Sequence, residues 1–167
     1  MSKHLESYRI RWNDLDANRH MANTSYFSLF NDTRMRFLAA HGVTQEVFEQ
    51  ARTGPVIFNE SMHYFREVHV GDLVYIDLEC SGYSENGTFF EFQQHLYNEK
   101  GEICSYLEIL AAWFNIDTRK LVSPVEAIQN GIKAIPRSDG FRILKKEDTR
   151  RVSPEKMTQK LPIELLR

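Results

Sequence analysis

Apolar and polar residues alternate at the start of the chain, and the spacing then changes to a helical one. Residues 5–13 alternate as a β-strand does, and a polar turn follows at residues 13–20. From about Asn23 the large apolar residues recur at intervals of three and four, which predicts one long helix that ends at Gly42. A second, shorter helix is expected over residues 44–51.

The rest of the pattern is typical of strands separated by turns. Four strands are expected at residues 55–66, 72–83, 88–97 and 102–116. The Asn86-Gly87 pair between two of them predicts a hairpin with a type I′ turn, in which both central residues have positive φ. A strand, a long helix and an antiparallel run of strands together indicate an α+β domain with one helix packed against the sheet.

Two helix starts carry residue types that cap helices. Asn23, Thr24 and Ser25 stand at the beginning of the long helix, so one of these side chains is expected to cap it. Further along, Ser123 is expected to be the cap of another helix, with Pro124 as its first residue.

Charge divides the chain unequally. Its 167 residues suit one domain, and the net charge of −2 splits into −7 for residues 1–131 and +5 for residues 132–167. We expect a single domain over 1–131 and a basic C-terminal extension over 132–167, built as an arm (132–152) and a short helix from Ser153. The extension is expected to fold back on the acidic body, and binding of nucleic acid or of CoA phosphates are the alternatives.

Composition excludes several classes of protein. With 42% apolar and 26% charged residues, and no apolar stretch near 20 residues, the chain is expected to be cytoplasmic, neither secreted nor embedded in a membrane. Cys80 and Cys104 stand 24 apart without a CxxC motif, so free buried thiols are expected, with no disulfide scaffold or structural zinc. The six histidines include no i, i+4 pair on a helix, so no metal is expected.

Groups that can do chemistry gather in the polar turn before the long helix. They are Asn13, Asp14, Asp16, Asn18, Arg19, His20 and Asn23. A helix N-terminus offers unpaired N–H groups that suit a developing negative charge, and a nearby carboxylate or histidine can serve as base, nucleophile or water-positioning group. The alternatives are that Asp16 only stabilises the turn and that His20 is a solvated or packed side chain.

Two segments resemble the hotdog-fold thioesterase superfamily. They are D-L-D-A-N-R-H-M-A-N-T-S-Y at residues 14–26 and Y-F-R-E-V-H-V-G-D at residues 64–72, within a similarity that covers about residues 5–117. The resemblance implies an α+β hotdog fold, in which an antiparallel sheet wraps a long central helix. It also implies one hotdog per subunit, a homodimer or a tetramer of dimers, a sheet that continues between subunits and sites at that interface.

The resemblance also implies roles for single residues. In the 4-hydroxybenzoyl-CoA thioesterase branch, the position of Asp16 is the catalytic carboxylate, the position of Asn23 presents its backbone N–H to the thioester carbonyl, and Tyr26 occupies a shared aromatic position. Plant acyl-ACP thioesterases have catalytic residues at the positions of Asp16, Asn18 and His20, and their strand glutamate corresponds to Glu67.

Two positions depart from the family pattern. The 4-hydroxybenzoyl-CoA enzymes lack a histidine at the position of His20. Many relatives have glycine where this chain has Arg19, which would either close part of the pocket or contact an anionic group of the substrate.

The implied function is hydrolysis of an acyl-CoA thioester with a fatty or aromatic acyl group, without a cofactor. The alternatives are an acyl-ACP thioesterase and a hotdog protein that binds acyl-CoA without turnover. No nucleic-acid partner is expected, because the chain lacks aromatic platforms and a helix-turn-helix pattern.

Overall fold

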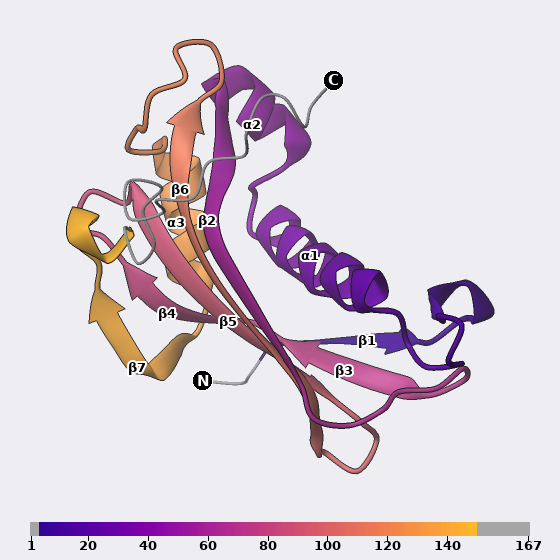
Figure 1. The fold of residues 1–167 in the computed structure, drawn as a ribbon. Helices are drawn as coiled ribbons and strands as arrows, with labels where there is room; N and C mark the ends of the chain where they lie inside the picture. Colours follow the sequence, from indigo (N-terminus) through magenta and orange to yellow (C-terminus); the bar gives the residue numbers. More distant parts are fainter. Residues whose placement is uncertain (1–3, 150–167) are drawn as a thin grey trace, which may run out of the picture.

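A long helix lies across one face of a curved sheet in the computed structural model, which describes residues 4–149 (Figure 1). The strands are β1 (Leu5–Arg9), β2 (Thr53–Tyr64), β3 (Leu73–Asp77), β4 (Glu79–Tyr83), β5 (Phe89–Tyr97), β6 (Ile103–Asn115) and β7 (Arg137–Ile143). The helices are α1 (Asn23–Ala40), α2 (Gln45–Ala51) and α3 (Glu126–Ala134), with short 3-10 turns η1 (Trp12–Asp14) and η2 (Lys146–Thr149). None of these helices is both long enough and apolar enough to cross a membrane.

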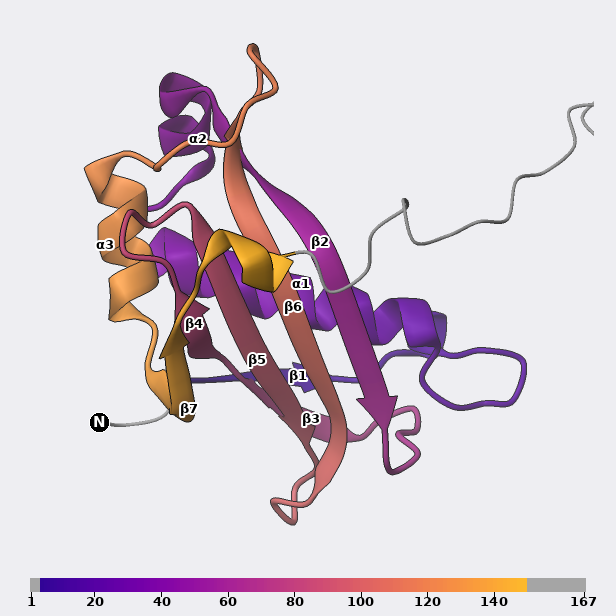
Figure 2. The same ribbon diagram turned by 60° about the vertical axis from the view of Figure 1, so that its left-hand side comes forward.

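The seven strands form one sheet around α1. In the middle, β5 pairs with β6 on one side and with β3 and β4 in turn on the other. β1 extends the sheet beyond β3, β7 extends it beyond β4, and β2 pairs with β6 (Figure 2). Every pairing is antiparallel except that of β4 with β7. The predicted α+β hotdog fold, a long central helix wrapped by an antiparallel sheet, is confirmed.

The core lies between α1 and the concave face of the sheet. Phe30, Phe37 and Leu38 of α1 are almost completely buried in one cluster with apolar residues of β3, β5 and β6. Cys80 and Cys104 are both free and buried, as predicted. Burial of this apolar face, at about 25 cal/mol per Å² of area removed from water, is what holds α1 in place.

The predicted strand at 72–83 is divided in two at Leu78, directly after Asp77. The Asp77 carboxylate accepts a hydrogen bond from the backbone N–H of His95 at 2.6 Å, and the Gln94 side chain donates to the Asp77 carbonyl at 3.3 Å. Side chains therefore satisfy backbone groups that a regular ladder would pair. The sheet changes direction here, and β3 and β4 pair with different parts of β5.

The expected caps of the helices are not formed. The N-cap of α1 is Ala22, no side chain caps it, and Asn23 is the first helical residue. The N-cap of α3 is Val125 instead of Ser123. The Ser123 hydroxyl donates to the carbonyl of Asn86 in the β4–β5 turn, so it is used in a tertiary contact that the local sequence does not show.

The β4–β5 hairpin forms where it was predicted, but its turn is not type I′. Only Gly87, with φ of 74°, has positive φ there. Ser84 and Phe89 close a four-residue turn, and the Asn86 side chain accepts hydrogen bonds from Ser84 and from the Thr88 N–H. The longer turn lets the Asn86 side chain replace part of the backbone pairing.

The segment 132–152 was expected to be a loop or arm, and part of it is regular structure instead. α3 continues to Ala134, β7 pairs in parallel with β4, and η2 follows. Arg142 of β7 donates to the Glu91 carboxylate of β5 at 2.7 Å. The helix start at Ser153 lies outside the described residues, and the division of the chain at 131/132 stays a prediction.

Candidate active site

The polar turn before α1 is a compact loop tied to the segment that follows β2. Leu15 and Met21 pair as an antiparallel bridge, and the Asp16 N–H donates to the His20 carbonyl at 2.9 Å. The Met21 N–H then donates to the Val68 carbonyl at 2.8 Å. These backbone bonds bring residues 16–20 beside residues 64–69, far away in sequence.

Asp16 is held by the backbone of its own loop. Its Oδ1 accepts from the N–H of Asn18 at 2.7 Å and from that of His20 at 3.4 Å. The side chain is exposed, and Oδ2 has no hydrogen-bond partner within residues 4–149. One oxygen therefore fixes the carboxylate, and the other is available to a substrate or a water molecule.

The start of α1 stands next to this carboxylate. The Ala22 N–H donates to the Asp14 carbonyl at 2.8 Å, which fixes where the helix begins. Because no side chain caps this end, the first N–H groups of the helix, beginning with Asn23, point out of the helix without the usual side-chain acceptor. Such an end carries roughly half a positive charge and suits an oxyanion.

His20 pairs with a glutamate from the other segment. Its Nε2 lies 3.4 Å from Oε2 of Glu67, and the same oxygen lies 3.8 Å from Nε2 of His69. The two imidazole rings meet edge to face, with centroids 5.1 Å apart. The glutamate can therefore orient either imidazole for proton transfer.

These groups line one open pocket of about 380 Å³. Its lining residues are Asp16, His20, Met21, Asn23, Tyr26, Tyr64, Phe65, Arg66 and Glu67. Five of the seven sequence-predicted site residues are thus brought together, and Asn18 and Arg19 are not part of the lining. Asn18 reaches the site only through its backbone N–H.

Two tyrosines form an apolar wall of the pocket. Tyr26 of α1 is 4% exposed, and its ring packs edge to face against Tyr64 at the end of β2, with centroids 5.1 Å apart. Burial raises the pKa of Tyr26 to about 12. Tyr26 is therefore neutral at ordinary pH and serves as a packing surface.

Arg19 occupies a backbone conformation that favours glycine. Its φ is 66°, in the left-handed region, and its side chain is exposed at the tip of the loop. A side chain in this region costs roughly 1–2 kcal/mol relative to glycine. The loop keeps its shape in spite of this cost because backbone hydrogen bonds close it on both sides of Arg19.

The pocket residues of the second segment, apart from Glu67, are absent from the sequence-based prediction. Tyr64, Phe65 and Arg66 line the pocket, and His69 lies beside it against His20, because the Met21–Val68 hydrogen bond joins two distant segments. Arg66 donates to the Ile103 carbonyl at 2.9 Å, which fixes the position of its guanidinium. The signal that could have found them is their place beside Glu67.

His20, Glu67 and His69 also offer a possible metal site. One ligand atom from each lies within 4.8 Å of the others, and two histidines with one carboxylate suit zinc or iron. The i, i+4 criterion applied to the sequence does not detect this group, because its members come from two segments. Glu67 and His69 are exposed, and the three side chains already pair with one another.

A long helix wrapped by a curved antiparallel sheet, with a carboxylate at the start of that helix, defines the hotdog class of α+β proteins. The chain belongs to the thioesterase-like superfamily, whose family model matches residues 10–132.

Named relatives agree with this family. The acyl-CoA thioester hydrolase YbgC of Escherichia coli is 24% identical over 102 residues, which cover 61% of this chain and 75% of the relative. A Staphylococcus aureus protein solved in complex with CoA has a TM-score of 0.74 and 20% identity, covering 96% of this chain and 95% of its own. A 1,4-dihydroxy-2-naphthoyl-CoA thioesterase from Synechocystis has a TM-score of 0.71 and 12% identity, covering 80% and 97%. The two structures are similar to this chain in fold.

Proposed function

We propose that this protein hydrolyses acyl-CoA thioesters with a fatty or aromatic acyl group and releases the free acid and CoA. The observation that carries the proposal is that the Asp16 carboxylate and the uncapped start of α1 at Asn23 line one pocket. Family membership, the acyl-CoA thioester hydrolase among the relatives and the CoA complex of a protein with the same fold support the choice of substrate.

In the proposed reaction, Asp16 acts as the base. Its free Oδ2 takes a proton from a water molecule, and the water oxygen bonds to the thioester carbon. The carbonyl oxygen becomes an oxyanion, which accepts a hydrogen bond from the Asn23 N–H and is stabilised by the helix dipole. The C–S bond then breaks, and the thiolate leaving group takes the proton from Asp16.

A second route differs in the first bond formed. Asp16 itself attacks the thioester carbon and expels CoA, which leaves a mixed anhydride that water then hydrolyses. A single turnover in H₂¹⁸O with enzyme in excess tests the second route. Label that stays in the protein shows attack of water on the Asp16 carbonyl of an anhydride, whereas label in the released acid is expected both of the base route and of attack on the acyl carbonyl of the anhydride.

The surrounding residues have supporting roles in this proposal. His20, paired with Glu67 at 3.4 Å, orients the attacking water or the carbonyl. Tyr26 packs against the acyl group, Asn18 positions Asp16 through its backbone N–H, and Arg19 at the loop tip contacts an anionic group of CoA.

Replacing Asp16 tests the assignment directly. We expect Asp16→Asn to lower kcat by about 10²–10⁴-fold, the usual contribution of a general base, with an unchanged melting temperature because the amide oxygen still accepts the loop hydrogen bonds. Release of free thiol is measured with acetyl-, octanoyl-, palmitoyl- and benzoyl-CoA for both proteins. Since no metal takes part in the proposed reaction, EDTA should leave the rate unchanged.

The outcomes separate the possible functions. Turnover that peaks with one acyl class and disappears in Asp16→Asn supports the proposal. A variant that keeps most of the wild-type rate contradicts the role of Asp16. Tight acyl-CoA binding without thiol release contradicts hydrolysis and indicates a binding protein.

A further inference from the structure

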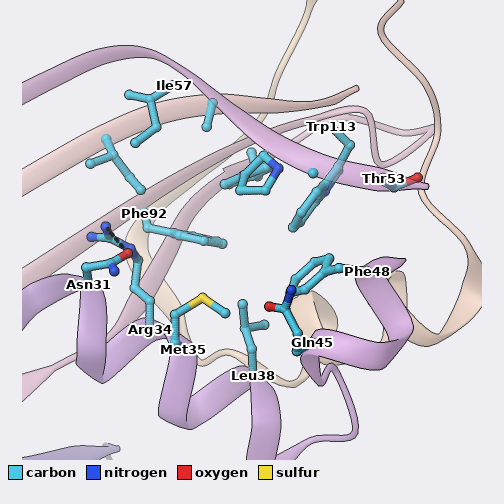
Figure 3. A pocket seen from close by; sticks show the side chains of 15 residues that line it. Asn31, Arg34, Met35, Leu38, Gln45, Phe48, Thr53, Ile57, Phe92 and Trp113 are labelled. Atoms are coloured by element: carbon cyan, nitrogen blue, oxygen red, sulfur yellow. Dashed lines mark hydrogen bonds between the residues drawn. The ribbon is translucent and has the colours of Figure 1, made fainter. Parts of the chain in front are cut away.

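A second cavity, of about 270 Å³, lies between α1, α2 and the sheet (Figure 3). Its walls are mostly apolar and include Leu38, Phe48, Phe92 and Trp113. Met35 and Ile57 are partly exposed at its border, which makes the cavity reachable from solvent. A mainly apolar cavity with a few polar groups is typical of a small-molecule site, and its volume suits a ligand smaller than most drugs.

Arg34 alone is charged among the described residues that line this cavity. It is 8% exposed, and its guanidinium donates to the neutral oxygens of Gln94 at 2.7 Å and of Asn31 at 3.3 Å. Within residues 4–149 its hydrogen-bond partners are these two amides, and Glu60 is the carboxylate whose charge acts on it. Burial lowers the pKa of Arg34 to about 10, and the charge of Glu60 offsets this only in part.

An unpaired buried charge is unfavourable, because desolvation is not repaid by a partner. A guanidinium has five N–H donors and two of them are used here, so donors remain for a further acceptor. A carboxylate is the acceptor that a guanidinium binds best, and apolar walls require an apolar body on the same ligand.

The cavity is separate from the pocket at Asp16. The two share no lining residue. Arg34 stands eleven residues after Asn23 on α1, which corresponds to about 16 Å along the helix axis. A ligand in this cavity therefore does not take part in the chemistry at the helix start.

We propose that this cavity binds a small carboxylic acid with an apolar body, such as a medium-chain fatty acid, and that the carboxylate pairs with Arg34. The site goes beyond the proposed function, since it requires no thioester and no turnover. Its occupant neutralises the buried charge and fills the space between α1 and the aromatic residues of the sheet.

Tryptophan fluorescence reports on this cavity. The chain has two tryptophans, of which Trp113 lines the cavity at 1% exposure and Trp12 is 74% exposed. In the Trp12→Phe protein, octanoate should change the remaining emission in a saturable way, and 1-octanol should bind at least tenfold more weakly. Arg34→Gln should weaken octanoate binding about ten- to hundredfold and leave octanol binding unchanged, because only a charge-assisted bond is lost.

A second pair of variants covers the case in which Arg34→Gln does not fold. Met35 of α1 is 36% exposed at the border of the cavity, so Met35→Glu should repel octanoate while Met35→Gln should not. Equal affinity for octanoate and octanol would overturn the pairing with Arg34. The absence of a saturable response in the folded Trp12→Phe protein would overturn the site itself. Both results are independent of thioester turnover, so they do not bear on the role of Asp16.

Discussion

Asp16 owes its position to backbone groups more than to neighbouring side chains. The two N–H donors that fix its Oδ1 belong to residues 18 and 20, and the loop is closed by further backbone bonds. A carboxylate held in this way keeps its geometry when the side chains around it change. The identity of the residue at position 18 should therefore matter less than its N–H.

Replacement of Asn18 tests this distinction. Asn18→Ala keeps the N–H that donates to Asp16 at 2.7 Å, so we expect turnover within about threefold of the wild-type rate. Asn18→Pro removes that donor, and loss of one positioning bond of this kind should cost at least tenfold in kcat. Both are compared by thiol release and by thermal unfolding. Equal large losses in the two variants would show that the Asn18 side chain itself is needed.

Asp14 connects the site to the acid stability of the fold. The Arg11 side chain donates hydrogen bonds to the Asp14 carboxylate. These bonds and the positive charge of Arg11 hold the pKa of the Asp14 carboxyl below its ordinary value of 3.8. A carboxyl with a lowered pKa stabilises the fold above its unfolded pKa, and this stabilisation is lost as the pH falls through the folded value.

The corresponding measurement is the urea midpoint of wild type and Asp14→Asn at pH 6 and pH 3. We expect the variant to be less stable at pH 6, and the difference to shrink towards pH 3 as the wild-type carboxyl becomes protonated. A difference that is the same at both pH values would contradict the role of the charge.

At the scale of single residues, the sequence shows which functional groups lie close together within one segment, but it does not show which distant segments contact each other. Asp16, His20 and Asn23 lie within one short segment, so their proximity follows from the chain itself. Tyr64 and Arg66 reach the pocket, and His69 reaches His20, through one tertiary hydrogen bond, which no local pattern encodes.

At the scale of elements, α3 is fixed by a close approach at Gly131. A Cβ at this position would lie 2.3 Å from Cγ2 of Val43, in the turn after α1. The absence of a side chain therefore lets α3 pack directly against the end of α1, with Ile128 and Ile132 buried beside it.

Gly131→Ala should destabilise the protein although alanine is the better helix former. Alanine gains up to about 1 kcal/mol in helix propensity, but overpacking a buried site typically costs about 1–3 kcal/mol. We expect a net loss in the free energy of unfolding, measured by urea denaturation. Gly140→Ala in β7 is the control, because nothing lies within 4 Å of its Cβ and its effect should be near zero. A stabilised Gly131→Ala protein would show that α3 can move away from Val43.

The strands and the long helix could be predicted because their periodicities are local. β2, β5 and β6 begin and end within two residues of the predicted bounds. β7 could not be predicted, because its sequence R-S-D-G-F-R-I is mostly polar. Its position depends on pairing with β4 and on the ion pair between Arg142 and Glu91. The predicted cap of α3 was wrong for the same reason, because Ser123 is engaged elsewhere in the fold.

At the scale of the whole molecule, β2 leaves one edge of the sheet open. It pairs with β6 and with no other strand among the described residues, and Ile57, Phe58, Tyr64 and Phe65 expose between 40% and 58% of their surface along it. Exposed strand edges with apolar side chains favour pairing with another chain. We propose that two copies pair through β2, which would bring the pockets of both to the interface.

Light scattering after size exclusion tests this pairing. The wild type should have the mass of two chains or a multiple of two, and Phe58→Asp should shift it towards the mass of one, because a buried carboxylate at the interface is unfavourable. Ile143→Asp, on β7 and 53% exposed, is the matched control and should leave the assembly intact. A Phe58→Asp protein that remains dimeric would exclude β2 as the interface, and a monomeric wild type would exclude the dimer.

The order of the elements along the chain has a consequence for biosynthesis. α1 leaves the ribosome early, yet the residues that cover its apolar face, including Phe90, Phe92 and Trp113, belong to β5 and β6 and are translated much later. Until then the nascent helix has no surface against which to bury Phe30 and Phe37. The core around α1 therefore closes only near or after the end of synthesis, and the apolar face of the helix stays uncovered until β5 and β6 have emerged.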